Sequence, residues 1–143
     1  MSRPIKFRAW DVFEKEMDYE VTIDPDGKVA AFNPLDGQYV RGFSDDEKVI
    51  MQYTGLKDRN GKEIYEGDIL KWYDRPLSWY RDPDKTSCSQ IIDVAVFSNG
   101  SFRSRKYSEL LINLCGTKDF NFLERSEIEV IGNIYETPLE DTP

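Results

Sequence analysis

The sequence predicts a mainly β fold of the α+β class, in which N-terminal antiparallel strands are followed by a small barrel-like part with one short helix. Two observations lead to this prediction. Short runs of alternating apolar and polar residues recur along the 143-residue chain, and turn-forming sequences separate them. The best helix candidate is a single short segment at residues 108–114.

The first three strands are expected at residues 5–10, 17–23 and 28–32. The first two alternate between apolar and polar side chains, as half-buried strands do. Before the third comes Asp24-Pro-Asp-Gly27, in which proline suits the first central position of a turn and glycine supplies a positive φ. Because the connections are short, we expect the three strands to form an antiparallel sheet.

The next segment, residues 33–42, is expected to be a loop because it contains two glycines and one proline. Residues 44–47, Ser-Asp-Asp-Glu, match the capping-box pattern, so a brief helical turn is an alternative there. Residues 48–53 are rich in β-forming residues and are short for a helix, and we prefer a strand.

Two Asn-Gly dipeptides predict hairpins further along the chain. Apolar residues flank Asn60-Gly61 within residues 51–70, and Asn99-Gly100 separates the most hydrophobic strand from its partner. Strands in this part are expected at residues 69–73, 91–97, 102–107 and 127–135.

The predicted helix at residues 108–114 places Leu110, Leu111 and Leu114 on one face, and Gly116 suits its C-terminal cap. A composition shift near residues 60–68 suggests a soft domain boundary. The resulting parts are an N-terminal β-rich part (1–62), a barrel part (63–136) and a frayed tail (137–143).

Charge argues against generic nucleic-acid binding. The chain carries 19 basic and 27 acidic residues, a formal charge of −8, and this charge is spread evenly along the sequence. Binding to phosphates requires clustered basic residues. Arg103, Arg105 and Lys106 are the main local exception, and we interpret them first as a charged strand edge.

Composition also limits the available chemistry. The chain has no histidine and two cysteines, Cys88 and Cys115. Without histidine, Ser-His-Asp and Cys-His catalysis are excluded, and a structural zinc site is not expected. We expect no catalytic residues, no cofactor and no metal. The polar N-terminus and the lack of a long apolar run predict a protein of the reducing cytoplasm, with free thiols and no membrane partner.

Glu66 and Asp68 are the most tempting acidic pair. On a strand they would share a face and could serve acid–base or metal chemistry. The alternative, which we prefer, is structural: Gly67 would bend the chain and Asp68 would accept backbone N–H groups in a turn.

The polar segment 74–89 is long for a loop in a compact domain, which is typical of functional loops. It contains Arg75, Trp79, Tyr80 and Arg81, aromatic and basic residues that could anchor a protein partner or stack on bases. These four residues are our candidate interaction surface, with packing against the barrel as the alternative.

Three stretches carry a family resemblance. They are Ile5-Lys-Phe-Arg-Ala-Trp-Asp11, Gln52-Tyr-Thr-Gly-Leu-Lys-Asp58 continued by Asn60-Gly-Lys-Glu-Ile-Tyr-Glu-Gly-Asp-Ile69, and Val130-Ile-Gly-Asn-Ile-Tyr-Glu136. In this order they resemble the YopX family of phage proteins, over nearly the whole chain. The resemblance implies a small phage or prophage product of unknown function, whose C-terminal part is an SH3-like β-barrel. It supplies no catalytic residues to carry over.

The resulting hypothesis is a non-enzymatic module that binds a protein partner or assembles with itself in the cytoplasm of the bacterial host. The alternative is a nucleic-acid-associated SH3-like barrel protein, against which the net charge argues. An enzyme with acidic catalytic residues is a third, weaker hypothesis.

Overall fold

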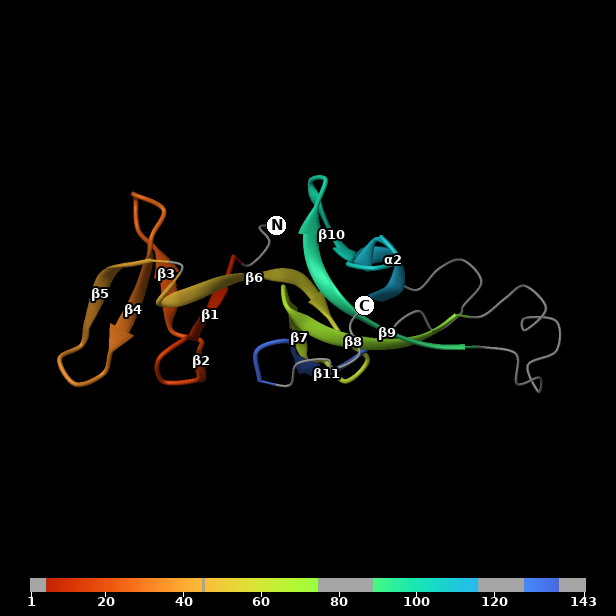
Figure 1. Ribbon diagram of the computed structural model, residues 1–143, viewed down its shortest axis with the longest axis horizontal. Coiled ribbons are helices and arrows are strands. Elements are labelled where there is room, and N and C mark those ends of the chain that lie inside the picture. Colours follow the sequence, from red (N-terminus) through yellow and green to blue (C-terminus); the bar gives the residue numbers. More distant parts are fainter. Residues whose placement is uncertain (1–4, 45, 75–88, 116–127, 137–143) are drawn as a thin grey trace. The chain divides into compact units, whose positions relative to one another are not determined.

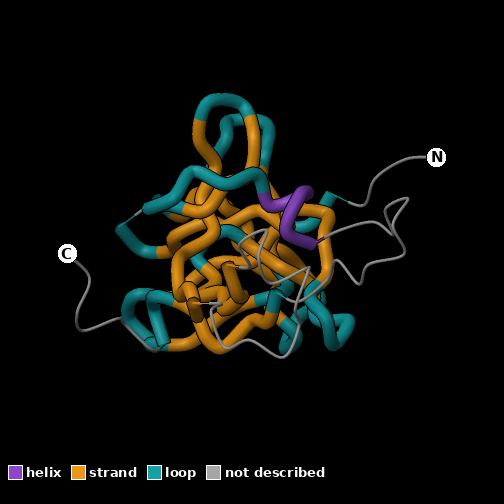
Figure 2. Tube along the Cα trace, turned by 90° about the vertical axis from the view of Figure 1, so that its right-hand side faces the viewer, coloured by secondary structure: helices purple, strands orange, loops and turns teal. Residues whose placement is uncertain are grey.

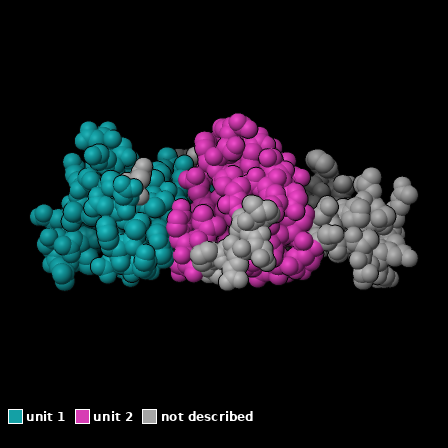
Figure 3. All heavy atoms as spheres, viewed as in Figure 1, with its two compact units in different colours: residues 1–55 teal, residues 56–143 magenta. Residues whose placement is uncertain are grey.

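The computed structural model describes residues 5–44, 46–74, 89–115 and 128–136, and it confirms the predicted fold class. The described residues are mostly β, with antiparallel sheets and one short helix (Figures 1 and 2). The chain divides into two compact units, residues 1–55 and 56–143 (Figure 3). This division falls within a strand. The domain boundary predicted between residues 62 and 63 stays a prediction.

Unit 1 contains two groups of strands. Their bounds are β1 Phe7–Asp11, β2 Glu16–Asp18, β3 Val21–Ile23, β4 Val29–Asn33, β5 Gln38–Phe43 and β6 Lys48–Lys57, which continues into unit 2. Strand β1 pairs antiparallel with β2 on one side and with residues 48–52 of β6 on the other. A separate three-stranded sheet has the order β3-β4-β5.

The prediction of one strand over residues 17–23 is wrong. This segment forms two short strands, β2 and β3, which belong to different sheets. The chain turns between them because the Asp18 carboxylate accepts a hydrogen bond from the Glu20 backbone N–H at 2.9 Å. The single antiparallel sheet expected for the first three strands is therefore wrong as well.

The loop expected at residues 33–42 is mostly strand. The turn between β4 and β5 uses residues 34–37, and Gln38 pairs with Asn33 immediately after it. Gly37 takes a φ of 71°, and its N–H donates to the Asn33 carbonyl at 2.9 Å. The glycine and proline therefore mark one tight turn, after which Tyr39 and Val40, both β-formers, continue the sheet.

Unit 2 is built around two long neighbouring strands. Its elements are the end of β6, β7 Glu63–Tyr65, β8 Asp68–Asp74, β9 Ser89–Ser98, β10 Ser101–Ser104, α2 Leu111–Cys115 and β11 Glu129–Asn133. Strand β9 pairs with β8 through its first half and with β10 through its second, giving the sheet order β10-β9-β8-β11. It curves strongly along its length, so that the sheet curls into a half-barrel (Figure 1).

The two predicted Asn-Gly turns are present, with different backbones. At Asn99-Gly100 both residues have positive φ, 52° and 80°, as a two-residue hairpin requires. At Asn60-Gly61 the glycine alone has a positive φ, of 82°. There the turn begins at Asp58, whose carbonyl accepts a hydrogen bond from the Gly61 N–H at 3.0 Å.

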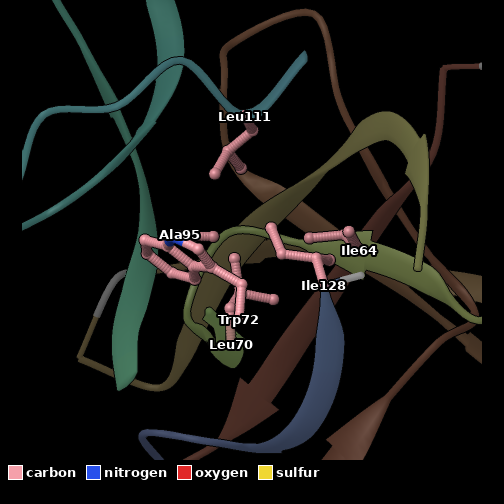
Figure 4. Close-up of a cluster of buried hydrophobic side chains, with 6 residues drawn as sticks. All are labelled: Ile64, Leu70, Trp72, Ala95, Leu111 and Ile128. Atoms are coloured by element: carbon pink, nitrogen blue, oxygen red, sulfur yellow. The ribbon is translucent and has the colours of Figure 1, made fainter. Parts of the chain in front are cut away.

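The core of unit 2 is a cluster of six buried residues from five parts of the chain. They are Ile64, Leu70, Trp72, Ala95, Leu111 and Ile128, whose side chains converge between β8, β9 and α2 (Figure 4). Side chains that alternate along β8 and β9 supply Leu70, Trp72 and Ala95 to the same face of the sheet, as the register pairs dictate.

The predicted helix is shorter and starts later. Ser108 has a φ of 56°, and Glu109 exchanges hydrogen bonds with Ser104, through its N–H to Oγ and its carbonyl to the Ser104 N–H. Residues 108–110 therefore extend along β10 and cannot join the helix. The predicted face is partly right, since Leu111 is buried and Leu114 packs against the core. Strand β10, expected to reach residue 107, ends at Ser104.

Candidate interaction surface

The surface predicted at Arg75, Trp79, Tyr80 and Arg81 lies outside the described residues, as does the predicted tail at 137–143. The described strands show where the chain enters and leaves the segment that contains these four residues. Asp74 at the end of β8 is paired with Ser89 at the start of β9. The predicted surface thus belongs to the connection between two adjacent strands, and it stays a prediction.

An edge strand of unit 1 is a second candidate, which the sequence analysis missed. Strand β5 ends the order β3-β4-β5 (Figure 1). Five of its six residues are exposed. Tyr39 is 51% exposed and Val40 is 47% exposed, and Leu35 in the preceding turn is 94% exposed. The adjacent β-formers Tyr39 and Val40 were the available signal, but the flanking glycines favoured a loop.

The two faces of β5 have different neighbours. Tyr39 pairs with Phe32 of β4, and their rings meet edge to face at 5.5 Å between centroids. Val40 pairs with Ala31 on the opposite face. The register then shifts before the Val29–Phe43 pair, near Gly42, whose φ is 84°. Strand β5 therefore presents a regular stretch of about four residues, ended by a bulge.

The basic residues in and after β10 are partly exposed. Arg105 and Lys106 are exposed beside Tyr107, whereas Arg103 donates from its guanidinium to the Ser108 carbonyl at 3.1 Å. The backbone of this loop is held by Asp93, a buried residue of β9 whose carboxylate accepts the N–H groups of Lys106 and Tyr107 at 2.7 and 3.2 Å. The backbone of this loop is therefore held in place, and it exposes the cations Arg105 and Lys106 and the ring of Tyr107.

The acidic residues of the 51–70 stretch have structural contacts. Asp68 is buried and accepts the Tyr65 N–H at 2.8 Å, and Gly67 between them has a φ of 86°. This confirms the turn interpretation of Tyr65-Glu-Gly-Asp68. Among the described residues, no group of three or more Asp, Glu or Cys side chains is placed to hold a metal ion.

Asp58 is the acidic residue whose role the sequence did not reveal. It is buried, and its Oδ1 accepts the N–H groups of Asn60 and Lys62, both at 2.8 Å. Its Oδ2 accepts the N–H of Val130, 72 positions later, at 3.0 Å. One carboxylate therefore closes the β6–β7 hairpin and ties it to β11.

Unit 1 contains a half-buried ion pair. Lys48 Nζ lies 2.9 Å from Asp11 Oδ2 and 3.7 Å from Asp18 Oδ2, and 5.0 Å from the centroid of the Phe43 ring. Hydrogen bonding from the Glu14 N–H, and then from Lys48, holds the pKa of Asp11 below its ordinary value. These contacts join β1, β2 and β6.

No helix in the described parts of the chain has the length and apolar character needed to cross a bilayer.

Comparison with known proteins identifies the family. The model of the family described as YopX protein matches residues 6–140. The crystal structure of protein EF1440 from Enterococcus faecalis is similar, with 33% identity, a TM-score of 0.59, and coverage of 96% of this chain and 97% of that one. Protein yopX from Bacillus subtilis shares the fold, with 23% identity, a TM-score of 0.54, and coverage of 93% and 94%. No curated protein matches the chain. The chain belongs to the YopX family, as its three sequence stretches predicted.

Proposed function

We propose that this protein is a small phage- or prophage-encoded interaction module without enzymatic activity, which binds a protein partner or further copies of itself in the cytoplasm of its bacterial host. One observation carries the proposal: β5 is an edge strand with exposed Tyr39 and Val40. An exposed edge offers unpaired backbone N–H and C=O groups, and another strand can bind to them.

The placement of the acidic residues supports a binding role over catalysis. Asp58, Asp68 and Asp93 are buried, and each accepts backbone N–H groups that hold a turn or loop in place. A carboxylate that acts as a catalytic base needs a lone pair directed at substrate or water. The exposed edge of β5 carries Tyr39 and Val40, which suits recognition of another macromolecule.

The test compares two surface variants in capture experiments. Immobilised protein is incubated with host lysate and with labelled protein of its own sequence, and bound chains are identified by mass spectrometry. Val40→Asp should abolish the specific capture, because it places a charge in the middle of the edge. Phe13→Ser is the matched control, since Phe13 is also exposed but lies in the turn between β1 and β2. Equal capture by both variants would contradict the proposal.

The second candidate is a nucleic-acid-associated protein, which Arg105, Lys106 and Tyr107 favour because cations and an aromatic ring lie together on a fixed loop. Fluorescence anisotropy with single- and double-stranded oligonucleotides at about 50 mM salt would detect such binding where it is strongest. Binding that falls steeply with added salt and is lost in an Arg105→Ala/Lys106→Ala variant would support this candidate. No binding at low salt would eliminate it.

A further inference from the structure

We propose that the partner at the β5 edge is a second copy of the same chain, whose β5 pairs antiparallel with this one around a two-fold axis at Val40. The inference rests on the proposed function and identifies the partner. The two three-stranded sheets would join into one sheet of six strands, in the order β3-β4-β5-β5-β4-β3.

Symmetry limits the possible registers. A two-fold axis perpendicular to a sheet keeps every side chain on its own face, so one residue of β5 must pair with its own copy. An axis at Arg41 would set two guanidinium groups opposite each other, which is unfavourable. An axis at Tyr39 would pair Arg41 with Gly37, which lies in the turn. The axis at Val40 is the register without either conflict.

The Val40 register gives complementary contacts on both faces. On one face, Val40 meets the Val40 of the second copy, next to Ala31. On the other face, Tyr39 of each copy lies opposite Arg41 of its neighbour, so that two cation–π contacts form. Phe32, packed edge to face against Tyr39, supports the ring that receives the cation.

The same register explains two features of the edge. A charge such as Arg41 normally discourages edge pairing, but here it faces an aromatic ring. The positive φ of Gly42 ends the regular stretch, so the paired segment is short. A short two-fold contact closes on itself and gives a dimer that forms at high concentration and does not extend into fibres.

Cysteine cross-linking tests the register. In a Cys88→Ser/Cys115→Ser background, Val40→Cys should form a disulfide-linked dimer under mild oxidation, because the two side chains lie directly opposite. Tyr39→Cys alone and Arg41→Cys alone should cross-link poorly, whereas an equimolar mixture of the two should give the mixed dimer. Cross-linking of Tyr39→Cys alone as efficiently as of Val40→Cys would overturn the register.

Sedimentation equilibrium of the unmodified chain tests the dimer itself. We expect dimerisation that weakens at least about tenfold in Arg41→Ala, which removes both cation–π contacts. Phe13→Ser should dimerise as the unmodified chain does. A monomer at all concentrations up to about 1 mM, beyond the range of weak specific association, would overturn the inference. The proposed function would survive a monomeric result if Val40→Asp lost capture of a lysate protein. It fails only if Val40→Asp captures both lysate proteins and labelled copies of the chain as Phe13→Ser does.

Discussion

Replacing Asp58 by asparagine is the most informative test of how unit 2 is held together. The carboxylate receives three backbone N–H groups, two from its own turn at Asn60 and Lys62 and one from Val130 of β11. Asparagine has nearly the same shape, and its one carbonyl oxygen can keep the two turn contacts. Its amide group would then direct N–H bonds toward the Val130 N–H, so that this contact is lost.

The magnitude follows from the contacts. Asp58→Asn removes one hydrogen bond to a charged acceptor and leaves a strand N–H unpaired, for a loss of about 2–3 kcal/mol in the free energy of unfolding. Asp58→Ala removes all three contacts, but water can reach the exposed turn amides and recover part of the loss. We therefore expect about 3–5 kcal/mol for Asp58→Ala.

Asp24 provides a matched control within the same chain. Asp24-Pro-Asp-Gly-Lys28 and Asp58-Arg-Asn-Gly-Lys62 share the pattern Asp-x-x-Gly-Lys, and Asp24 Oδ1 accepts the N–H groups of Asp26 and Lys28 at 2.9 and 3.0 Å. The glycines of the two turns have nearly equal φ, 83° and 82°. Asp24→Asn therefore keeps the same local contacts and involves no distant strand.

Urea unfolding and hydrogen exchange measure the difference. Asp58→Asn should lower the unfolding free energy and accelerate exchange of the Val130 amide, whereas Asp24→Asn should change stability by about 0.5 kcal/mol or less. Equal effects of the two substitutions would refute the reasoning, because the Val130 contact would then contribute nothing. An unchanged Val130 exchange rate in a destabilised Asp58→Asn would refute it as well.

Three further predictions follow from the same contacts. The pKa of Asp11 is lowered, first by the Glu14 N–H and then by Lys48. The ionised Asp11 therefore stabilises the folded state fully above its ordinary pKa of 3.8, and this stabilisation is lost as the pH falls through the lower folded-state pKa. Asp11→Asn should remove this acid-dependent step from pH-unfolding curves. Gly61→Ala should cost about 1–2 kcal/mol in urea unfolding through its positive φ alone, since space for a Cβ is open, and an unchanged midpoint would contradict this. Asp93→Asn should cost about 1–3 kcal/mol and speed amide exchange in the loop after β10, and unchanged exchange would count against its role.

The fold class was predictable because its signals are local. Alternating side chains and Asn-Gly turns depend on a few neighbouring residues, and the β9–β10 hairpin at Asn99-Gly100 follows from them directly. The errors arose where a side chain redirects the backbone. Asp18 ends β2 through its bond to Glu20, and Ser108 with a positive φ delays the helix. Neither role can be predicted from the residue type alone, since Asp and Ser make similar local hydrogen bonds in many turns.

The roles of the buried carboxylates were less predictable. Both Asp-x-x-Gly-Lys turns can be found in the sequence, but nothing local distinguishes the half-buried Asp24 from the fully buried Asp58. The difference is the N–H of Val130, which is 72 positions from Asp58 in the sequence. Asp93 likewise depends on Lys106, from a separate turn. Long-range hydrogen bonds of this kind depend on the folded topology, so a turn motif predicts its own turn and not its tertiary partner.

The distribution of hydrogen bonds also bears on where binding takes place. Asp58 and Asp68 of the acid-rich 51–70 stretch accept backbone N–H groups inside unit 2, as Asp93 of β9 does. The stretch that identifies the family therefore stabilises the fold. A strand at the edge of a sheet is in the opposite situation, since half of its backbone groups face outward. On β5 these groups lie beside Tyr39 and Val40, where binding another strand would satisfy them and cover apolar surface together. Of the described strands that end a sheet order, β5 is the longest, which favours it as the place where a second chain binds.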